Sequence, residues 1–263
     1  VVPQSPRRID DPTTVQRLRL RVEGPDLSGA DLEGAGQSVR GDQMVIVDAR
    51  GLKAEPADPD LDRYLQPEPF LESDAPEIVE EAAKATAGAT TPRARAERLL
   101  RHVASLLEKK PTVSLPSARE VLRTKVGDCN EHTALYVAMA RAAALPARIA
   151  VGLVYLRGAF YYHAWPEVYL AESPQRGLWL PVDPTLNQFP ADATHIRLVR
   201  GGLDRQATIL PLIGRTKITI LDLELAPGST PVLVGRPVQD TRPLDIPIPR
   251  RDGSGRGCWS IPR

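Results

Sequence analysis

The sequence predicts an α+β fold in which helices pack on an antiparallel sheet. Three observations predict it. Segments with helical spacing of apolar residues gather in 76–144, strand-like segments follow one another from 148 onward, and short turn sequences separate the first of these strands. Helices that come first, followed by consecutive strands, are typical of the α+β class.

The first fifty residues are predicted to form a small β segment. Apolar residues alternate with arginines over 17–22, as in a half-exposed strand, and 45–47 is a second short strand. Between them, 26–35 contains two five-residue units similar to a pentapeptide repeat. Two units cannot stack a solenoid core, so a Gly-rich turn is the better interpretation. Residues 51–76 are rich in proline and acidic residues, which indicates a linker draped over the surface.

Four helices are predicted next. Their expected ranges are 76–87, 91–108, 117–123 and 129–144. The second begins at Thr91, a good N-cap residue, with proline at the following position and an apolar stripe beyond it. The fourth follows a Gly-Asp pair and ends before Pro146.

Five strand-like segments follow the helices. Their expected ranges are 148–156, 160–170, 178–182, 195–199 and 216–223. Arg157-Gly158 and the stretch 173–177 are typical of hairpin turns between the first three strands. After Ala226 the chain is rich in proline and glycine without any period, which indicates an extended or disordered tail.

Composition excludes several classes of function. In 263 residues, 34 Lys+Arg against 33 Asp+Glu leave a net charge of +1, so electrostatics favours no nucleic-acid partner. Uncharged apolar stretches reach about ten residues, short of the roughly 18–20 that span a bilayer, so no membrane span is predicted. Two cysteines exclude a disulfide-rich scaffold and a four-cysteine metal site. The chain begins at Val1 without methionine, so we expect a processed or trimmed chain or a piece of a longer protein.

Cys129 is the first candidate for chemistry. It follows Gly127 and Asp128 and lies in the first turn of the helix predicted over 129–144. The partial positive charge and unpaired N–H groups of a helix N-terminus stabilise a thiolate and can bind an oxyanion. A buried structural thiol explains an isolated cysteine equally well.

His163 and Asp183 extend this candidate site. Period 2 places His163 and Trp165 on one face of a strand, and Asp183 ends the next strand. Taken singly, such a histidine is typical of a core and an aspartate before proline is typical of a turn. If the two strands pair as a hairpin, and if the helix at Cys129 begins against that sheet, the three residues form the nucleophile, base and orienting acid of covalent catalysis.

Four motifs surround these residues. In chain order they are Gly127-Asp128-Cys129-Asn130-Glu131, Ala147-Arg148, His163-Ala164-Trp165-Pro166-Glu167-Val168 and Asp183-Pro184-Thr185. Together they resemble the bacterial transglutaminase-like family of the papain-like cysteine superfamily, over residues 112–200. The resemblance implies Cys129 as nucleophile, His163 as general base and Asp183 as the residue that orients the histidine.

The resemblance also carries expectations for the neighbouring residues. It implies that Trp165 and Asn130 shape the site, Trp165 mainly by packing, and that Arg148 is structural. The backbone N–H of Cys129 would be one oxyanion donor, and the sequence identifies no second one.

The resemblance also implies a division of the chain. We expect a small β segment over 1–50, a linker over 51–76, a transglutaminase-like catalytic domain over 77–225 and a tail over 226–263. The catalytic domain would have a papain/transglutaminase-like core, with helices packed on an antiparallel sheet. A bacterial protein is implied, an extracytoplasmic location is compatible with it, and the oligomeric state stays open.

The remaining histidines are interpreted as structural or solvated. His132 lies three residues after Cys129, but the sequence holds no second pair of metal ligands, so a core or solvated histidine is favoured. His102 is expected to be exposed. His195 precedes a strand and could border the cleft, although a structural role is favoured. No metal and no organic cofactor is implied.

The implied chemistry is acyl transfer through a thioester on peptide or protein amides. An amine as acceptor makes the enzyme a transglutaminase, and water makes it a peptidase or amidase. The triad does not distinguish the two. A catalytically silent peptide-binding module is a further alternative, which the presence of all three catalytic residue types disfavours.

Cys258 is the second cysteine of the chain and lies in the tail. The favoured interpretation is an unpaired terminal thiol. A sharper hypothesis is that the tail folds back and Cys258 forms a disulfide with Cys129, which would block the enzyme.

Overall fold

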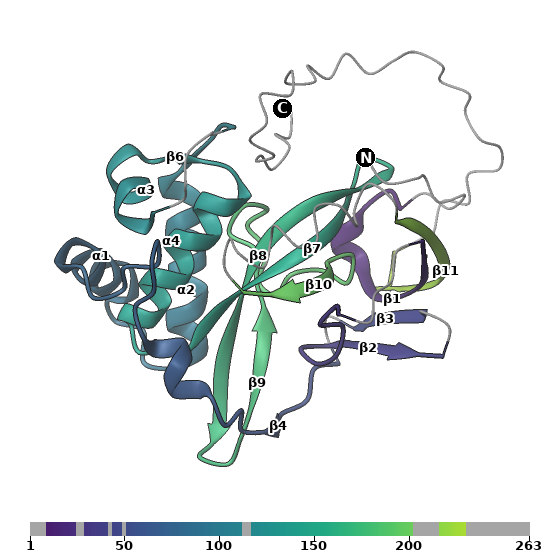
Figure 1. Ribbon diagram of the computed structural model, residues 1–263, viewed down its shortest axis with the longest axis horizontal. Helices are drawn as coiled ribbons and strands as arrows, with labels where there is room; N and C mark the ends of the chain where they lie inside the picture. The colour runs from purple at the N-terminus through teal and green to yellow at the C-terminus, as the bar shows by residue number, and fades with distance from the viewer. Residues whose placement is uncertain are drawn as a thin grey trace.

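The structure, a computed structural model, has three layers. It describes residues 9–24, 29–41, 44–48, 51–111, 117–201 and 216–229. Helices cover one face of a five-stranded antiparallel sheet, and a smaller four-stranded sheet lies beyond the opposite face (Figure 1). This is the α+β arrangement that the sequence predicts.

Four α-helices form the first layer. They are α1 (Pro76–Thr86), α2 (Pro92–Leu106), α3 (Ala118–Thr124) and α4 (Cys129–Ala142). The helix α4 is buried on nearly every side, because the other three helices surround it and strands β7 and β8 lie against it. A helix enclosed in this way belongs to the core. There are also two short 3-10 helices among the described residues, η1 (Pro12–Thr14) and η2 (Leu61–Leu65), and η2 contacts α4 and β7.

The central sheet holds the predicted hairpins. Its strands are β4 (Glu55–Pro56), β7 (Ala147–Leu156), β8 (Ala159–Ser173), β9 (Arg176–Pro181) and β10 (Ile196–Arg200), in the spatial order β10-β7-β8-β9-β4. The edge strand β4 lies within the segment that the sequence analysis interprets as a linker. That segment also buries Leu71 and Ala75 in the core, so it is more closely attached than a loose connection.

The smaller sheet joins the two ends of the described chain. Its strands are β1 (Val15–Glu23), β2 (Gln37–Arg40), β3 (Met44–Asp48) and β11 (Lys217–Leu225), in the order β11-β1-β3-β2. The strand predicted at 216–223 therefore exists, but it pairs with β1 and not with the central sheet. The strand β2 was not predicted. The domain division itself stays a prediction.

Short contacts attach the smaller sheet to β10. Gln37 donates from Nε2 to the carbonyl of Arg197 at 2.9 Å and accepts from the N–H of Arg197 at 2.8 Å. The N–H of Asp31 donates to the carbonyl of Leu198 at 2.8 Å. These bonds hold β10 at the junction of the two sheets.

A third, two-stranded sheet is also present. Strands β5 (Glu108–Lys109) and β6 (Val126–Gly127) form a short parallel pair, and β6 ends directly before the N-cap of α4. Among the described helices, none combines the length and the apolar character needed to cross a membrane.

Candidate functional site

The start of α4 is held by local sequence. Asp128 is the N-cap, and its Oδ1 accepts the N–H of Asn130 at 3.0 Å. Glu131 completes a capping box, because its Oε2 accepts the N–H of Asp128 at 2.9 Å. A Cβ on Gly127 would lie 2.2 Å from the Cβ of Glu131, so only glycine fits before this cap. Cys129 is thereby placed as the first residue of the helix, as predicted.

Cys129 is buried and disulfide-bonded in this structure. The other cysteine of the chain, Cys258, lies outside the described residues, and so does the tail beyond residue 229. The hypothesis that Cys258 pairs with Cys129, which the sequence favours less than an unpaired thiol at Cys258, therefore stays a hypothesis. Any reaction of the Cys129 thiol requires the reduced form of the protein.

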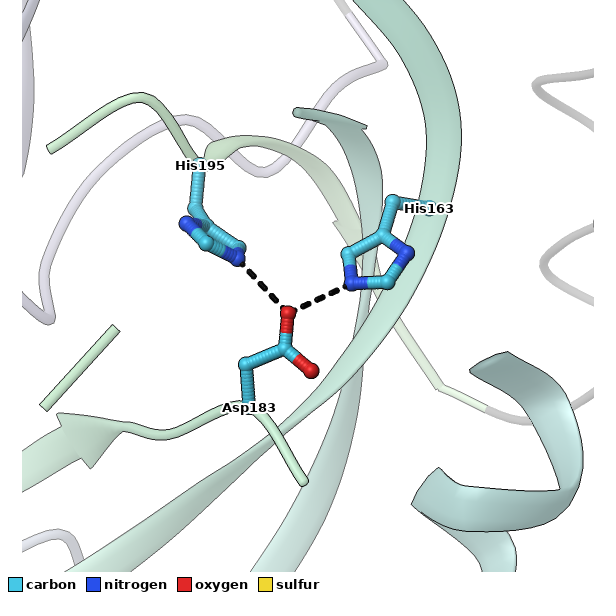
Figure 2. Close-up of side chains that lie close together, drawn as sticks. All are labelled: His163, Asp183 and His195. Atoms are coloured by element: carbon cyan, nitrogen blue, oxygen red, sulfur yellow. Dashed lines mark hydrogen bonds and ion pairs between the residues drawn. The ribbon is translucent and has the colours of Figure 1, made fainter. Parts of the chain in front are cut away.

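His163 and Asp183 meet across adjoining strands. The Nε2 atom of His163, on β8, lies 2.7 Å from Oδ2 of Asp183, which follows β9 (Figure 2). Both side chains are buried. The hairpin β8–β9 therefore brings together the pair that the sequence analysis expects to meet, and the other ring nitrogen of His163 points away from the carboxylate.

The charge of Asp183 decides the tautomer of His163. Burial alone would raise the pKa of the Asp183 carboxyl, but the neighbouring His163 and His195 outweigh this effect and hold its pKa well below the usual range. Its Oδ1 also accepts the N–H of Leu186 at 2.9 Å. An ionised carboxylate only accepts hydrogen bonds, so in the neutral form of the His163 ring Nε2 carries the hydrogen and Nδ1 carries the lone pair.

A direct bond links α4 to the strand of His163. The hydroxyl of Thr133, one turn after Cys129, donates to the carbonyl of Ala164 at 3.1 Å. Ala164 immediately follows His163, and α4 packs along β8 at this level. The helix that begins with Cys129 is thus attached to the strand that carries His163.

A second histidine contacts the same carboxylate oxygen. Nε2 of His195 lies 3.0 Å from Oδ2 of Asp183 (Figure 2). From the sequence, a structural role is favoured for His195, which could also border the cleft. Trp165 packs against both rings, stacked on His163 at 6.1 Å between centroids and edge-on to His195 at 5.2 Å. The packing role expected of Trp165 agrees with these contacts and stays a prediction.

Gly152 allows β10 to approach the site. It pairs with His163 on one side and with Arg197 on the other. A Cβ at this position would lie 2.0 Å from the backbone oxygen of Ile196, so a side chain would push β10 away. The close approach of β10 is what places His195, directly before that strand, next to Asp183.

His195 is held between two acidic groups. Its Nδ1 lies 3.1 Å from the carbonyl oxygen of Asp192 and 3.3 Å from Oδ1 of the same residue. Burial alone would lower the pKa of His195, but the hydrogen bonds to Asp183 and Asp192 outweigh this and raise it to about 10. The ring therefore carries a positive charge at neutral pH.

A buried ion cluster lies further along β8. The Glu167 carboxylate is fully buried and contacts three arginines. Its oxygens lie 2.8 Å from Nε of Arg148, 2.7 Å from a terminal nitrogen of Arg197 and 2.8 Å from Nε of Arg200. Burial would raise the pKa of Glu167, but the three cations lower it far below its usual value. The structural role expected of Arg148 agrees with these contacts, and its guanidinium also stacks on Trp179 at 3.7 Å.

Three other sequence candidates form no hydrogen bond with His163 or Asp183 within the described residues. His132 is a buried core histidine whose Nδ1 donates to the carbonyl of Asp128 at 2.7 Å, and burial lowers its pKa. Asn130 stands next to Cys129, and its buried Oδ1 has no hydrogen-bond partner within the described residues. His102 is half-buried rather than exposed, because it bonds Glu81 at 2.7 Å between α2 and α1.

One group of ligand-type atoms in the described chain could be weighed as a metal site. Atoms of His163, Asp183 and His195 lie within 4.8 Å of one another. Their separations of 2.7 and 3.0 Å are those of hydrogen bonds. Because the protonated His195 has no lone pair to offer, the donor set fits a hydrogen-bonded triad better than a cation site.

Comparison with known proteins adds a family match. Residues 80–184 match the family model of the transglutaminase-like superfamily. None of the curated proteins matches the sequence. Among solved structures, a candidate cysteine protease from Cytophaga hutchinsonii shares 17% identity with a TM-score of 0.47, over 89% of this chain and 86% of that one. The periplasmic domain of TgpA from Pseudomonas aeruginosa shares 20% identity with a TM-score of 0.42, over 71% and 76%.

Proposed function

Because residues 80–184 match the family model of the transglutaminase-like superfamily, we propose that the chain is a cysteine-dependent acyltransferase or hydrolase acting on peptide or protein amides. Cys129 is the proposed nucleophile, His163 the general base and Asp183 the orienting acid.

One observation carries this proposal. The 2.7 Å bond from His163 Nε2 to a buried, ionised Asp183 leaves Nδ1 of His163 with a lone pair that can take a thiol proton. Cys129 starts the helix that is bonded to the next residue of the same strand. A structural histidine needs no such fixed tautomer, whereas a general base does.

The proposed reaction has two halves. In the first, the Cys129 proton passes to Nδ1 of His163 and the sulfur attacks the amide carbon. The C–N bond then breaks, the amine leaves with the proton from His163, and a thioester remains. In the second half, an amine or water attacks the thioester and gives a proton to His163, and this proton returns to the sulfur as the acyl product leaves. The N-terminal amides of α4 support the oxyanion in both halves.

The identity of the acyl acceptor, an amine or water, distinguishes a transglutaminase from a peptidase or amidase. Small primary amines coupled to a Gln-containing protein would identify a transglutaminase, and amide release without coupling would identify a peptidase or amidase. The assay supplies both acceptors at once to the reduced protein, with a labelled amine and mass spectrometry of the products. A silent peptide-binding module would give neither product, although it would bind the peptide.

Thiol reactivity tests the proposal before any substrate is known. The reduced protein is alkylated with iodoacetamide across pH, and labelling of Cys129 is followed by mass spectrometry. An activated Cys129 labels rapidly near pH 6, whereas an ordinary thiol labels only above about pH 8. His163→Ala should abolish the rapid phase. His102→Ala, a matched change on α2, should leave it intact. Slow labelling of the unmodified chain at pH 6 would refute the proposed chemistry.

A further inference from the structure

We propose that His195 is a positioning residue of this site, which as a fixed imidazolium holds the Asp183 carboxylate against His163 and offsets part of its negative charge. The proposal rests on the proposed function, because it assigns His195 a role through Asp183 in the same reaction. It extends the predicted triad by a fourth residue.

The contacts of Asp183 leave its carboxylate little freedom. Its Oδ2 accepts from His163 at 2.7 Å and from His195 at 3.0 Å, and its Oδ1 accepts from the backbone of Leu186 at 2.9 Å. The two rings approach the same oxygen, and Figure 2 shows the carboxylate between them. With His195 absent, one side of Oδ2 would lose its donor in a fully buried place.

Geometry by itself indicates that both nitrogens of His195 carry hydrogen. Nε2 faces a carboxylate oxygen of Asp183, and Nδ1 faces the carbonyl and Oδ1 of Asp192. A neutral ring would point a lone pair at one of these acceptors.

Asp192, which accepts from Nδ1 of His195, is itself held in place by hydrogen bonds. Oδ1 of Asp192 accepts from the N–H of Thr194 at 2.8 Å and from its hydroxyl at 2.6 Å. Nε2 of Gln188 donates to Oδ2 of Asp192 at 2.7 Å. The fold therefore fixes the positions of Asp183 and Asp192 on either side of the His195 ring.

Several other charged or titratable groups lie around His195. The ring of His163 lies 5.7 Å away between centroids. Glu167, Arg197 and Asp48 line the same small cavity as His195, and Glu167 and Arg197 are bonded to each other at 2.7 Å. His132, near Asp183, has a lowered pKa because it is buried. Of the groups around Asp183, His195 is the one that contacts Oδ2 of its carboxylate beside His163.

Loss of the positive charge on His195 should shift the pH profile of Cys129 reactivity in one direction. Without this nearby cation, a proton is harder to remove from the Cys129 thiol and from the His163 ring. Both the acid and the alkaline limb of the reactivity profile should therefore move to higher pH. A unit charge at the observed ring separation of 5.7 Å corresponds to a shift of about 0.5 pH unit in water and about 2 at an effective dielectric constant of 20.

The test compares His195→Gln with His102→Gln. Both changes replace a histidine that contacts a carboxylate, but His102 lies between α1 and α2. The pH profile of Cys129 alkylation is measured for both variants and for the unmodified chain, all reduced. We expect an upward shift of about 0.5–2 units for His195→Gln and none for His102→Gln.

The outcomes separate the two proposals. If Cys129 of the unmodified chain reacts as an ordinary thiol, the proposed function fails and the role of His195 fails with it. If Cys129 is activated but His195→Gln leaves the profile in place, only the role of His195 is refuted. A purely structural His195 would lower the melting temperature without moving the profile.

A second measurement does not depend on the folding of any variant. Long-range ¹H–¹⁵N correlation spectra of the unmodified chain distinguish imidazolium from either neutral tautomer. At pH 8 we expect His195 as imidazolium, in line with its raised pKa. A neutral His195 at pH 8 would overturn the proposal.

Discussion

Glu167 at the centre of three arginines offers a sharp test of the packing. Glu167→Gln keeps the shape of the side chain and removes its charge. Arg148 keeps a contact with Asp58 and Arg200 keeps one with Asp31. Within the described residues Arg197 has no second carboxylate in hydrogen-bond contact, and its other partners are backbone carbonyls. Because the side chain of Arg197 is 3% exposed, its charge would be left buried and unmatched.

Breaking a buried ion pair of this kind costs about 3–5 kcal/mol of unfolding free energy. For a chain of this size each kcal/mol lowers the melting temperature by about 2–4 °C, so the loss should be about 6–20 °C. Thermal and urea unfolding measure it. Glu120→Gln is the matched control, because Glu120 pairs with Arg123 in an exposed bridge and should show no resolved loss. Equal stability of the two variants would refute the assignment of Glu167 as the anchor of the cluster.

Three further predictions concern the site and its surroundings. Asp183→Asn should reduce kcat/KM by up to about 10⁴-fold, because the amide no longer fixes the tautomer of His163; an unchanged rate in steady-state assays would contradict this. Gly152→Ala should lower the free energy of unfolding by about 1–3 kcal/mol or more, since its Cβ meets the backbone of β10, and urea titration would detect the loss. Stability should peak between about pH 4.5 and 6.5 in melting curves across pH 3–10. The lowered pKa values of Asp183 and Glu167 give stability that is lost as pH falls below about 4, and the raised pKa of His195 gives stability that is lost as pH rises from about 6.5 towards its folded value. A maximum near pH 9 would show that these groups do not control stability.

Local signals account for the elements that the sequence predicts well. Thr91 caps α2 through its side chain, and Asp128 and Glu131 cap α4, as their spacing indicates. Alternation of apolar residues identifies β1, whereas β7 and β8 are identified by long runs of apolar and aromatic residues. Caps and periods act within a few residues, so they can be recognised without knowing what lies across from them.

Two strands show what local sequence patterns do not predict: β2 was not recognised as a strand, and the partner of β11 was not identified. The strand β2 reads Gln-Ser-Val-Arg and has almost no apolar alternation, and it is a strand because β3 provides its hydrogen bonds. β11 has a clear strand pattern, but its partner β1 lies near the other end of the chain. A pattern that predicts a strand does not identify its partner, because pairing depends on packing over the whole fold.

The candidate site divides in the same way. The sequence by itself determined the residue types, their order and their family resemblance, which follow from the motifs around Cys129, His163 and Asp183. Only the tertiary structure decided that His195 shares an oxygen of Asp183 and that Gly152 makes room for it. The residues next to His195 in the sequence do not indicate that it contacts Asp183. Its charge and its role arise from acidic groups that the folded chain brings to either side of the ring.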